Sequence, residues 1–417
     1  MATIIFAPVW FGGTLLTTDD NIGAIAGYKS HLEAGFGVES WSESPLVGLP
    51  AGSSPLNWSN LLIKLMPVRL FANTFHALSL LAGSIALFFY LRRKDLAPAA
   101  ALLAALTAFW LGSNFTLIYA GHIRKFSIVF LFCATLICLD KLFETKRWNW
   151  SVIVGALVGI MFLEQQDVAL FFGLFAGAYA LFLVAQSPGE RTASFLRLLP
   201  IVVIALLTCI GPVISSYQQN VAGIASMEQS RAEKWDFCTQ WSQPPEDSID
   251  FIAPGYTGWR SGEPSGPYWG RMGRSAGWEQ TRQGFMNFRL ENTYLGVIPV
   301  LLAIFALFSA RASAHRAVIL FWGGAALVAL LLAFGKYTPL YALFWQLPVI
   351  NNIRNPNKFI QIFQVAVAIL AAFGLDTLLK NKASSKKFFW VTIGVFGFLA
   401  LWAFGTAAGQ AGIAADF

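Results

Sequence analysis

Residues 317–335 read AVILFWGGAALVALLLAFG, without one charged side chain. A helix needs about 20 mainly apolar residues to cross the hydrocarbon core of a bilayer, so this run predicts a membrane helix. Comparable apolar runs recur along the chain at 2–16, 73–91, 97–119, 126–142, 150–163, 168–186, 198–217, 293–309, 358–378 and 388–406. We therefore predict an all-α integral membrane protein, a polytopic bundle of about 11 transmembrane helices that forms a single unit over residues 1–417.

The first of these runs is shorter than the others, with about 15 apolar residues where a spanning helix needs roughly 20. No basic residue precedes it, whereas a secretory signal peptide carries basic residues before its apolar segment. We therefore expect a first membrane helix that is short or lacks its first turns.

The composition agrees with a membrane protein, because 56% of the residues are hydrophobic and only 12% are charged. A soluble domain carries about twice that charged fraction. The net charge of +7 comes from Lys and Arg residues spread over short loops, which does not indicate a nucleic-acid-binding surface. The four cysteines have neither the CxxC spacing of a metal site nor the pattern of a disulfide framework.

Basic residues orient the predicted bundle. They cluster in alternate connections, which the positive-inside rule places in the cytoplasm: 92–94, 141–147, 191–197, 311–316 and 380–387. Two long segments then face outward. We expect residues 17–72 to contain an amphipathic helix lying in the interface from Trp58 to Phe71. We expect residues 218–292, which are rich in aromatic residues, Pro and Gly, to form a cap over the bundle.

Two adjacent carboxylates, Asp19 and Asp20, follow the first apolar run. One interpretation is helix capping, with a helix over residues 21–32. The other is a general base at the outer membrane boundary, where partial burial raises the pKa of a carboxylate toward neutrality. The same pair could hold a divalent metal, and this is the one cofactor that the sequence leaves open.

Cations on the predicted outer side point to an anion site. His122, Arg124 and Lys125 lie at the outer end of a span, either as interfacial anchors or as a phosphate clamp with His122 as donor or proton shuttle. Arg354 and Lys358 flank Pro356 at the start of the 358–378 span. Cations are disfavoured at a helix N-terminus unless an anion joins them, so this pair is the better phosphate candidate.

The polar stretch Glu164-Gln165-Gln166-Asp167 separates two apolar runs that lie too close together for a real loop. It is either a tight turn or a set of side chains that project into a polar cavity and bind sugar hydroxyls. The sequence contains no GxSxG, P-loop, HExxH or dinucleotide-binding motif that would indicate another chemistry.

The chain resembles the YfhO-type bacterial membrane proteins, which belong with the GT-C glycosyltransferases. The matching elements run in order along nearly the whole chain: the Asp after the first span, Trp41, Gly48-Leu49-Pro50, Gly121-His122 with Lys125, Gln166, Tyr179, Pro244-Pro245, Pro254-Gly255-Tyr256-Thr257-Gly258, Tyr268-Trp269-Gly270, Tyr294-Leu295-Gly296 with Pro299, Gly335-Lys336-Tyr337-Thr338-Pro339 with Tyr341, Leu347-Pro348, Arg354, Pro356, Lys358-Phe359 and Gly374-Leu375-Asp376. In two places the chain departs from the family. Glu164-Gln165-Gln166 stands where relatives tend to carry Gly-His-Pro-Gln, and relatives tend to run longer after the last span.

The resemblance implies an enzyme of the bacterial cytoplasmic membrane that takes a sugar from a polyprenyl-phosphate carrier at the outer leaflet. The sugar would pass to an envelope glycan or lipid acceptor with inversion of the anomeric centre. The family's acidic residue maps onto Asp19 or Asp20. The expected substrate cavity then includes Glu164, Gln166, Asp167, Tyr337 and Trp269. Two other classes stay open: a transporter or flippase for lipid-linked or anionic solutes, and a non-catalytic GT-C-like subunit of an envelope membrane complex.

Overall fold

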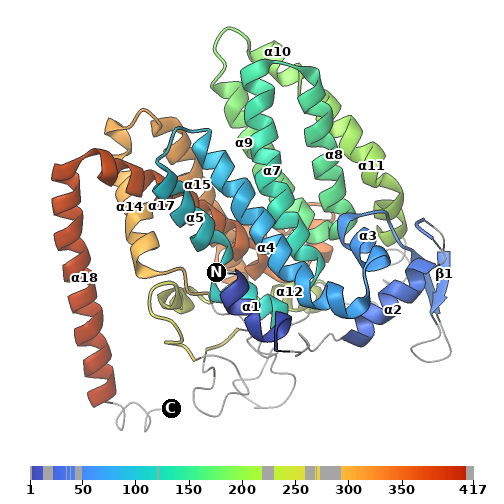
Figure 1. Cartoon of the computed structure of the whole chain (residues 1–417), viewed down its shortest axis with the longest axis horizontal. Coiled ribbons are helices and arrows are strands. Elements are labelled where there is room, and N and C mark those ends of the chain that lie inside the picture. Colours follow the sequence, from blue (N-terminus) through green and yellow to red (C-terminus); the bar gives the residue numbers. More distant parts are fainter. Residues whose placement is uncertain are drawn as a thin grey trace.

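The computed structural model describes residues 2–12, 22–33, 35–37, 39–42, 49–119, 122–217, 230–258, 268, 270–272 and 293–409. Within these ranges the chain is a bundle of helices with one small antiparallel sheet of two strands, β1 (Glu39–Ser42) and β2 (Leu49–Ser53). The sheet is a difference from the all-α prediction, but it lies outside the helical bundle (Figure 1).

Eight helical segments of the described chain are long and apolar enough to cross a membrane: Val68–Arg92, Pro98–Ile118, Arg124–Thr145, Gln166–Ala185, Arg191–Ile214, Arg316–Ala333, Pro356–Lys380 and Phe388–Gly405. Two further apolar helices are shorter, Trp148–Glu164 and Val297–Ala312. The chain is therefore a multi-pass membrane protein. The described residues give eight long spans and two shorter apolar helices where about eleven helices were predicted, and the N-terminal run contains the nine-residue α1 (Ala2–Trp10).

The helices of the bundle are α4 (Val68–Arg92), α5 (Pro98–Phe109), α6 (Gly112–Tyr119), α7 (Arg124–Thr145), α8 (Trp148–Glu164), α9 (Gln166–Ala185), α10 (Arg191–Leu196), α11 (Leu199–Tyr217), α14 (Val297–Ser309), α15 (Arg316–Ala333), α17 (Phe359–Lys380) and α18 (Lys382–Ala408). The predicted 97–119 span is broken between α5 and α6. Asn114 Nδ2 donates to Phe109 O over 2.9 Å there, which satisfies one carbonyl that the break exposes.

Helix α17 forms the centre of one half of the bundle and packs on α5, α14 and α15. Sixteen of its 22 residues are buried. A side chain at Gly374 would meet Leu302 O of α14 at 2.1 Å, so only glycine permits this approach of the two backbones. By contrast, α18 stands apart from the other helices in Figure 1, and its apolar side chains, such as Phe398 and Phe404, are exposed.

Figure 1 shows α10 and the connections α4–α5, α7–α8, α14–α15 and α17–α18 at one end of the bundle, and α1, α2 (Ile22–Glu33), α3 (Trp58–Leu65) and α12 (Arg231–Thr239) at the other. The first end carries the basic connections from which the orientation was predicted. The second end is therefore the outward one on the positive-inside rule.

The predicted interfacial helix over Trp58–Phe71 is divided in the structure. Helix α3 ends at Leu65, and α4 begins at Val68, so the last four residues of the predicted helix belong to a span. Pro67 explains the division, because proline lacks an N–H group and disfavours helical backbone in the residue before it. Met66 accordingly has an extended conformation (φ −102°, ψ 149°).

The described part of the 218–292 segment consists of α12 and the 3₁₀ helix η2 (Pro245–Phe251). It lies against the connection between α15 and α17, which contains η4 (Gly335–Tyr337), α16 (Pro339–Phe344), η5 (Ile350–Asn352) and η6 (Pro356–Lys358). Backbone hydrogen bonds join the two segments: Asn355 N to Cys238 O, 3.0 Å, and Asn357 N to Trp241 O, 3.1 Å.

Candidate functional site

A cavity of about 380 Å³ opens at the outward end of the bundle. Its lining comes from α6, the start of α7, the junction of α8 with α9, the loop after α12, and the turn that leads into α17. The lining residues are Ser113, Thr116, Leu117, His122, Lys125, Gln165, Asp167, Trp241, Gln243, Thr293, Asn352, Ile353, Arg354, Asn355, Asn357, Lys358, Ile360, Gln361 and Gln364. Segments far apart in the sequence thus build a polar chamber at this end of the bundle.

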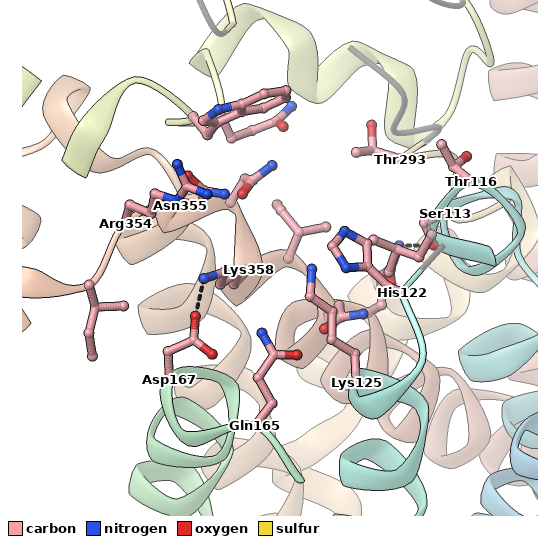
Figure 2. Close-up of a pocket in the computed structure, with 18 of the residues that line it drawn as sticks. Ser113, Thr116, His122, Lys125, Gln165, Asp167, Thr293, Arg354, Asn355 and Lys358 are labelled. Carbon is pink, nitrogen blue, oxygen red and sulfur yellow. Dashed lines mark hydrogen bonds and ion pairs between the residues drawn. The ribbon is translucent and has the colours of Figure 1, made fainter. Parts of the chain in front are cut away.

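Three of the cations predicted to bind phosphate, Lys125, Lys358 and Arg354, line this cavity. Figure 2 shows both lysine side chains at the cavity, the amino group of Lys358 directed toward Asp167 and that of Lys125 near His122. Both side chains are largely buried, with 8% of Lys125 and 9% of the Lys358 side chain exposed. Arg354 is exposed at the rim, where its guanidinium lies 5.3 Å from the centre of the Phe237 ring.

One carboxylate faces these cations. Asp167 forms an ion pair with Lys358, drawn as a dashed line in Figure 2, and its other oxygen accepts a hydrogen bond from Val168 N over 2.8 Å. The pair joins the first turn of α9 to the turn before α17. Three cations and one carboxylate of the described chain therefore line the cavity, which leaves it net positive.

His122 lies beside Lys125 in this cavity (Figure 2). Burial, together with the charges of Lys125 and Lys358, lowers the pKa of His122 to about 3. The imidazole is therefore neutral near pH 7. Its backbone carbonyl accepts a hydrogen bond from His76 Nε2 over 3.0 Å, which fixes the 122–123 turn against α4.

The turn before α17 has an unusual backbone. Asn355 adopts φ 72° and ψ 76°, a left-handed conformation that few residues other than Gly, Asn and Asp tolerate. The hydrogen bond from Asn355 N to Cys238 O holds it there. Backbone strain of this kind concentrates at functional sites, and here it brings Arg354 and Lys358 to the same cavity.

Two residues expected at the cavity have other roles. The Glu164 carboxylate receives Ser59 N at 3.0 Å and Ser59 Oγ at 2.5 Å, so it caps the N-terminus of α3. Arg124, also predicted to bind phosphate, acts electrostatically on this Glu164 carboxylate. Gln166 Nε2 donates to Pro212 O of α11 over 3.2 Å, while its neighbour Gln165 lines the cavity.

Tyr337 also serves a different contact from the one predicted. The guanidinium of Arg271 lies 4.3 Å from the centre of the Tyr337 ring and forms two hydrogen bonds with Glu246, at 2.5 and 2.9 Å. Tyr337 therefore ties the segment after η2 to the connection after α15.

The catalytic and metal predictions for Asp19 and Asp20, and the cavity prediction for Trp269, lie outside the described residues. Among the residues that are described, no three His, Cys, Asp or Glu side chains gather in a way that could hold a metal ion.

The sequence interpretation missed the amides of the cavity. Gln361 and Gln364 lie one helical turn apart in an apolar span, and polar residues on one face of a membrane helix are a usable signal. Gln243 carried no such signal, because it lies in an irregular polar segment. No family model, no curated protein and no solved structure matches this chain.

Proposed function

We propose that this protein is a GT-C-like membrane glycosyltransferase with about eleven membrane helices, acting at the outer face of the bacterial cytoplasmic membrane. It would take a sugar from a polyprenyl-phosphate carrier and pass it to an envelope glycan or lipid. The observation that carries the proposal is the convergence of Lys125, Lys358 and Arg354 on one cavity at the outward end of the bundle.

The charge of the cavity supports a phosphate ligand. Lys125, Lys358 and Arg354 line the cavity together with a single carboxylate of the described chain, Asp167, so the lining carries net positive charge. A phosphate diester is attracted by that charge and accepts hydrogen bonds from the lysines. The apolar helices around the cavity offer a surface for the polyprenyl chain, which a soluble phosphate-binding protein would not need.

In the proposed reaction, the acceptor hydroxyl attacks the anomeric carbon and gives its proton to the carboxylate of Asp19 or Asp20. The new C–O bond forms as the bond between the anomeric carbon and the phosphate oxygen breaks, so the configuration inverts. Polyprenyl phosphate leaves with the electron pair. Lys125 and Lys358 would stabilise the charge that develops on the leaving phosphate.

A transfer assay tests this proposal. Purified protein in lipid is given radiolabelled polyprenyl-phosphate sugars and envelope-extract acceptors, with Asp19→Asn, Asp20→Asn and Lys358→Met assayed in parallel. We expect label in the acceptor with the wild-type chain, loss with one aspartate variant and strong reduction with Lys358→Met. No transfer from any donor by a folded wild-type protein would reject the enzyme and favour a transporter or a non-catalytic subunit.

A further inference from the structure

The cavity contains buried amide atoms that have no hydrogen-bond partner in the part of the chain that the structure describes. Gln243 is fully buried, with 0% of its surface exposed, and neither its Nε2 nor its Oε1 makes a hydrogen bond. Its backbone N–H donates to Ala333 O over 2.9 Å, so the residue is fixed in place while its amide stays open. Asn355 Oδ1 and Gln361 Oε1 are likewise buried and unpartnered, and all three residues line the cavity.

Not every amide at the cavity lacks a hydrogen-bond partner. Gln364 Nε2 donates to Ser113 Oγ over 2.7 Å, so that amide is satisfied by the protein itself. An unsatisfied buried polar group is unfavourable, and native structures contain few of them. Four such atoms around one cavity therefore indicate a ligand that supplies the missing hydrogen bonds.

The chemistry of the open atoms restricts that ligand. Gln243 Oε1, Asn355 Oδ1 and Gln361 Oε1 are acceptors, so they need a partner with O–H or N–H groups. An ionised phosphate diester offers lone pairs only and cannot satisfy them. Gln243 presents a donor beside an acceptor, which is the pattern that matches two neighbouring hydroxyl groups.

We infer that Gln243, Asn355 and Gln361, here called the amide face, recognise the hydroxyl groups of a neutral sugar while the lysines hold its phosphate. This inference rests on the proposed function and identifies the part of the donor that each side of the cavity binds. An acidic sugar would fit less well, because its carboxylate adds acceptors where the amide face needs donors.

The variant Gln243→Leu isolates this role. Leucine has a similar size and removes both polar atoms, and no group of the described residues loses a partner, because the amide bonds to none of them. The ligand-free variant should therefore unfold at a temperature no lower than that of the wild type. A matched control is Gln166→Leu, which removes an amide that is bonded to Pro212 O and not to a ligand.

The experiment measures binding to the full chain in lipid nanodiscs. The probes are polyprenyl phosphate, the same carrier bearing a neutral hexose, the uncharged polyprenol and a free methyl hexoside. We expect Gln243→Leu to lower the affinity ratio of the sugar-bearing carrier to the bare phosphate by about tenfold, which corresponds to one or two neutral hydrogen bonds. Gln166→Leu should leave this ratio unchanged, and Gln361→Met should lower it less.

The outcomes separate the two proposals. If Gln243→Leu keeps the wild-type ratio, water satisfies the amide face and the inference is wrong, while the phosphate site stands. If wild-type protein binds neither charged carrier better than polyprenol, the proposed donor is wrong. Binding of the free methyl hexoside then decides. If the wild type binds it and Gln243→Leu does not, the amide face is a sugar site. If the wild type does not bind it, the inference about the amide face is wrong. Should Gln243→Leu fail to fold, Gln361→Met provides the same test.

Discussion

Two largely buried Lys–Asp pairs lie at opposite ends of the bundle and differ in what surrounds them. At the basic end, Lys94 Nζ lies 2.7 Å from Asp140 Oδ2, and Tyr179 OH donates to Asp140 Oδ1 over 2.8 Å. Tyr90 OH donates to Tyr179 OH over 3.0 Å. Trp322 Nε1 completes the chain by donating to Tyr90 OH over 3.1 Å.

This group, which we call the tyrosine cluster, joins α4, α7, α9 and α15, pairs its two opposite charges with each other and hydrogen-bonds both of its hydroxyls. At the outward end, Asp167 pairs with Lys358, but Lys125 and Arg354 line the same space and several amides stay open. A polar network whose members find their partners within the protein has a structural role, because it fixes one arrangement of the helices that it joins. A polar network in which buried atoms of the described residues lack hydrogen-bond partners indicates a ligand that supplies them.

The largest effect should come from breaking the tyrosine cluster. Asp140→Leu leaves Lys94 and Tyr179 without their acceptor in a nearly dry place, so we expect a loss of about 3–5 kcal/mol in unfolding free energy. Asp167→Leu should lose less, because 27% of the Asp167 side chain is exposed, against 2% of the Asp140 side chain. Denaturant titrations in mild detergent measure both.

The double variant Lys94→Met/Asp140→Leu is the control for this comparison. It leaves no unpaired charge, so much of the lost stability should return. If Asp167→Leu destabilises as strongly as Asp140→Leu, the outward pair is a second structural cluster and the distinction between the two ends fails.

The next prediction compares Lys358 with Arg354, which the sequence analysis assigned together to one phosphate site. Lys358 is almost buried and Arg354 is exposed, so a phosphate gains more from Lys358. We expect Lys358→Met to weaken binding of polyprenyl phosphate by about 1.5–3 kcal/mol, the range for hydrogen bonds to charged groups. Arg354→Met should weaken it by about 1 kcal/mol or less. Equal losses in nanodisc binding assays would mean that the phosphate lies at the rim and not in the cavity.

A smaller effect is expected at Glu164, which the sequence placed in the substrate cavity and the structure places under α3. Glu164→Leu leaves Ser59 N and Ser59 Oγ without their acceptor, so we expect a loss of about 1–3 kcal/mol in stability. Amide exchange in α3 should become faster, and the affinity for polyprenyl phosphate should not change. Glu164→Gln keeps one carbonyl-type acceptor and should show a milder loss. If Glu164→Leu lowers the affinity for polyprenyl phosphate, Glu164 belongs to the ligand site after all.

The sequence predicted those parts of the molecule that depend on hydropathy. The 317–335 run became α15, and the basic connections share one end of the bundle, because helix length and loop charge are local properties of the chain. The cations of the cavity were also identifiable, since Lys125 and Lys358 stand at the outer ends of apolar spans. Such positions are unfavourable for a cation that has no partner.

What the sequence could not predict depends on contacts between distant segments. Glu164 and Asp167 are three residues apart, yet one caps α3 and the other pairs with Lys358. Their difference arises because Gln165 interrupts the helix with an extended backbone (φ −155°, ψ 109°), which turns the two carboxylates toward different neighbours. Gln243 could not be predicted either. Its side-chain amide is notable because it has no hydrogen-bond partner among the described residues, and no local sequence pattern signals that.

A last effect should appear at His122, whose pKa depends on its burial and on the charges of the cavity. The charged or titratable groups that act on it are Lys125, Lys358, Asp167 and His76. Its folded-state pKa of about 3 lies below the unfolded value of 6.5, so the unfolded chain binds a proton first. His122 therefore makes stability fall as the pH decreases from about 6.5 toward 3, and His122→Gln should flatten this part of the profile.

Anion binding should reverse part of that depression. A phosphate beside Lys125 and Lys358 offsets their repulsion of the imidazolium, so the pKa of His122 should rise and binding should take up a fraction of a proton below pH 5. Histidine-labelled NMR titration with and without polyprenyl phosphate measures the pKa directly, with His122→Gln for assignment. A phosphate that binds tightly while this pKa stays near 3 would lie away from both lysines, and the contrast between the cavity and the tyrosine cluster would then need another explanation.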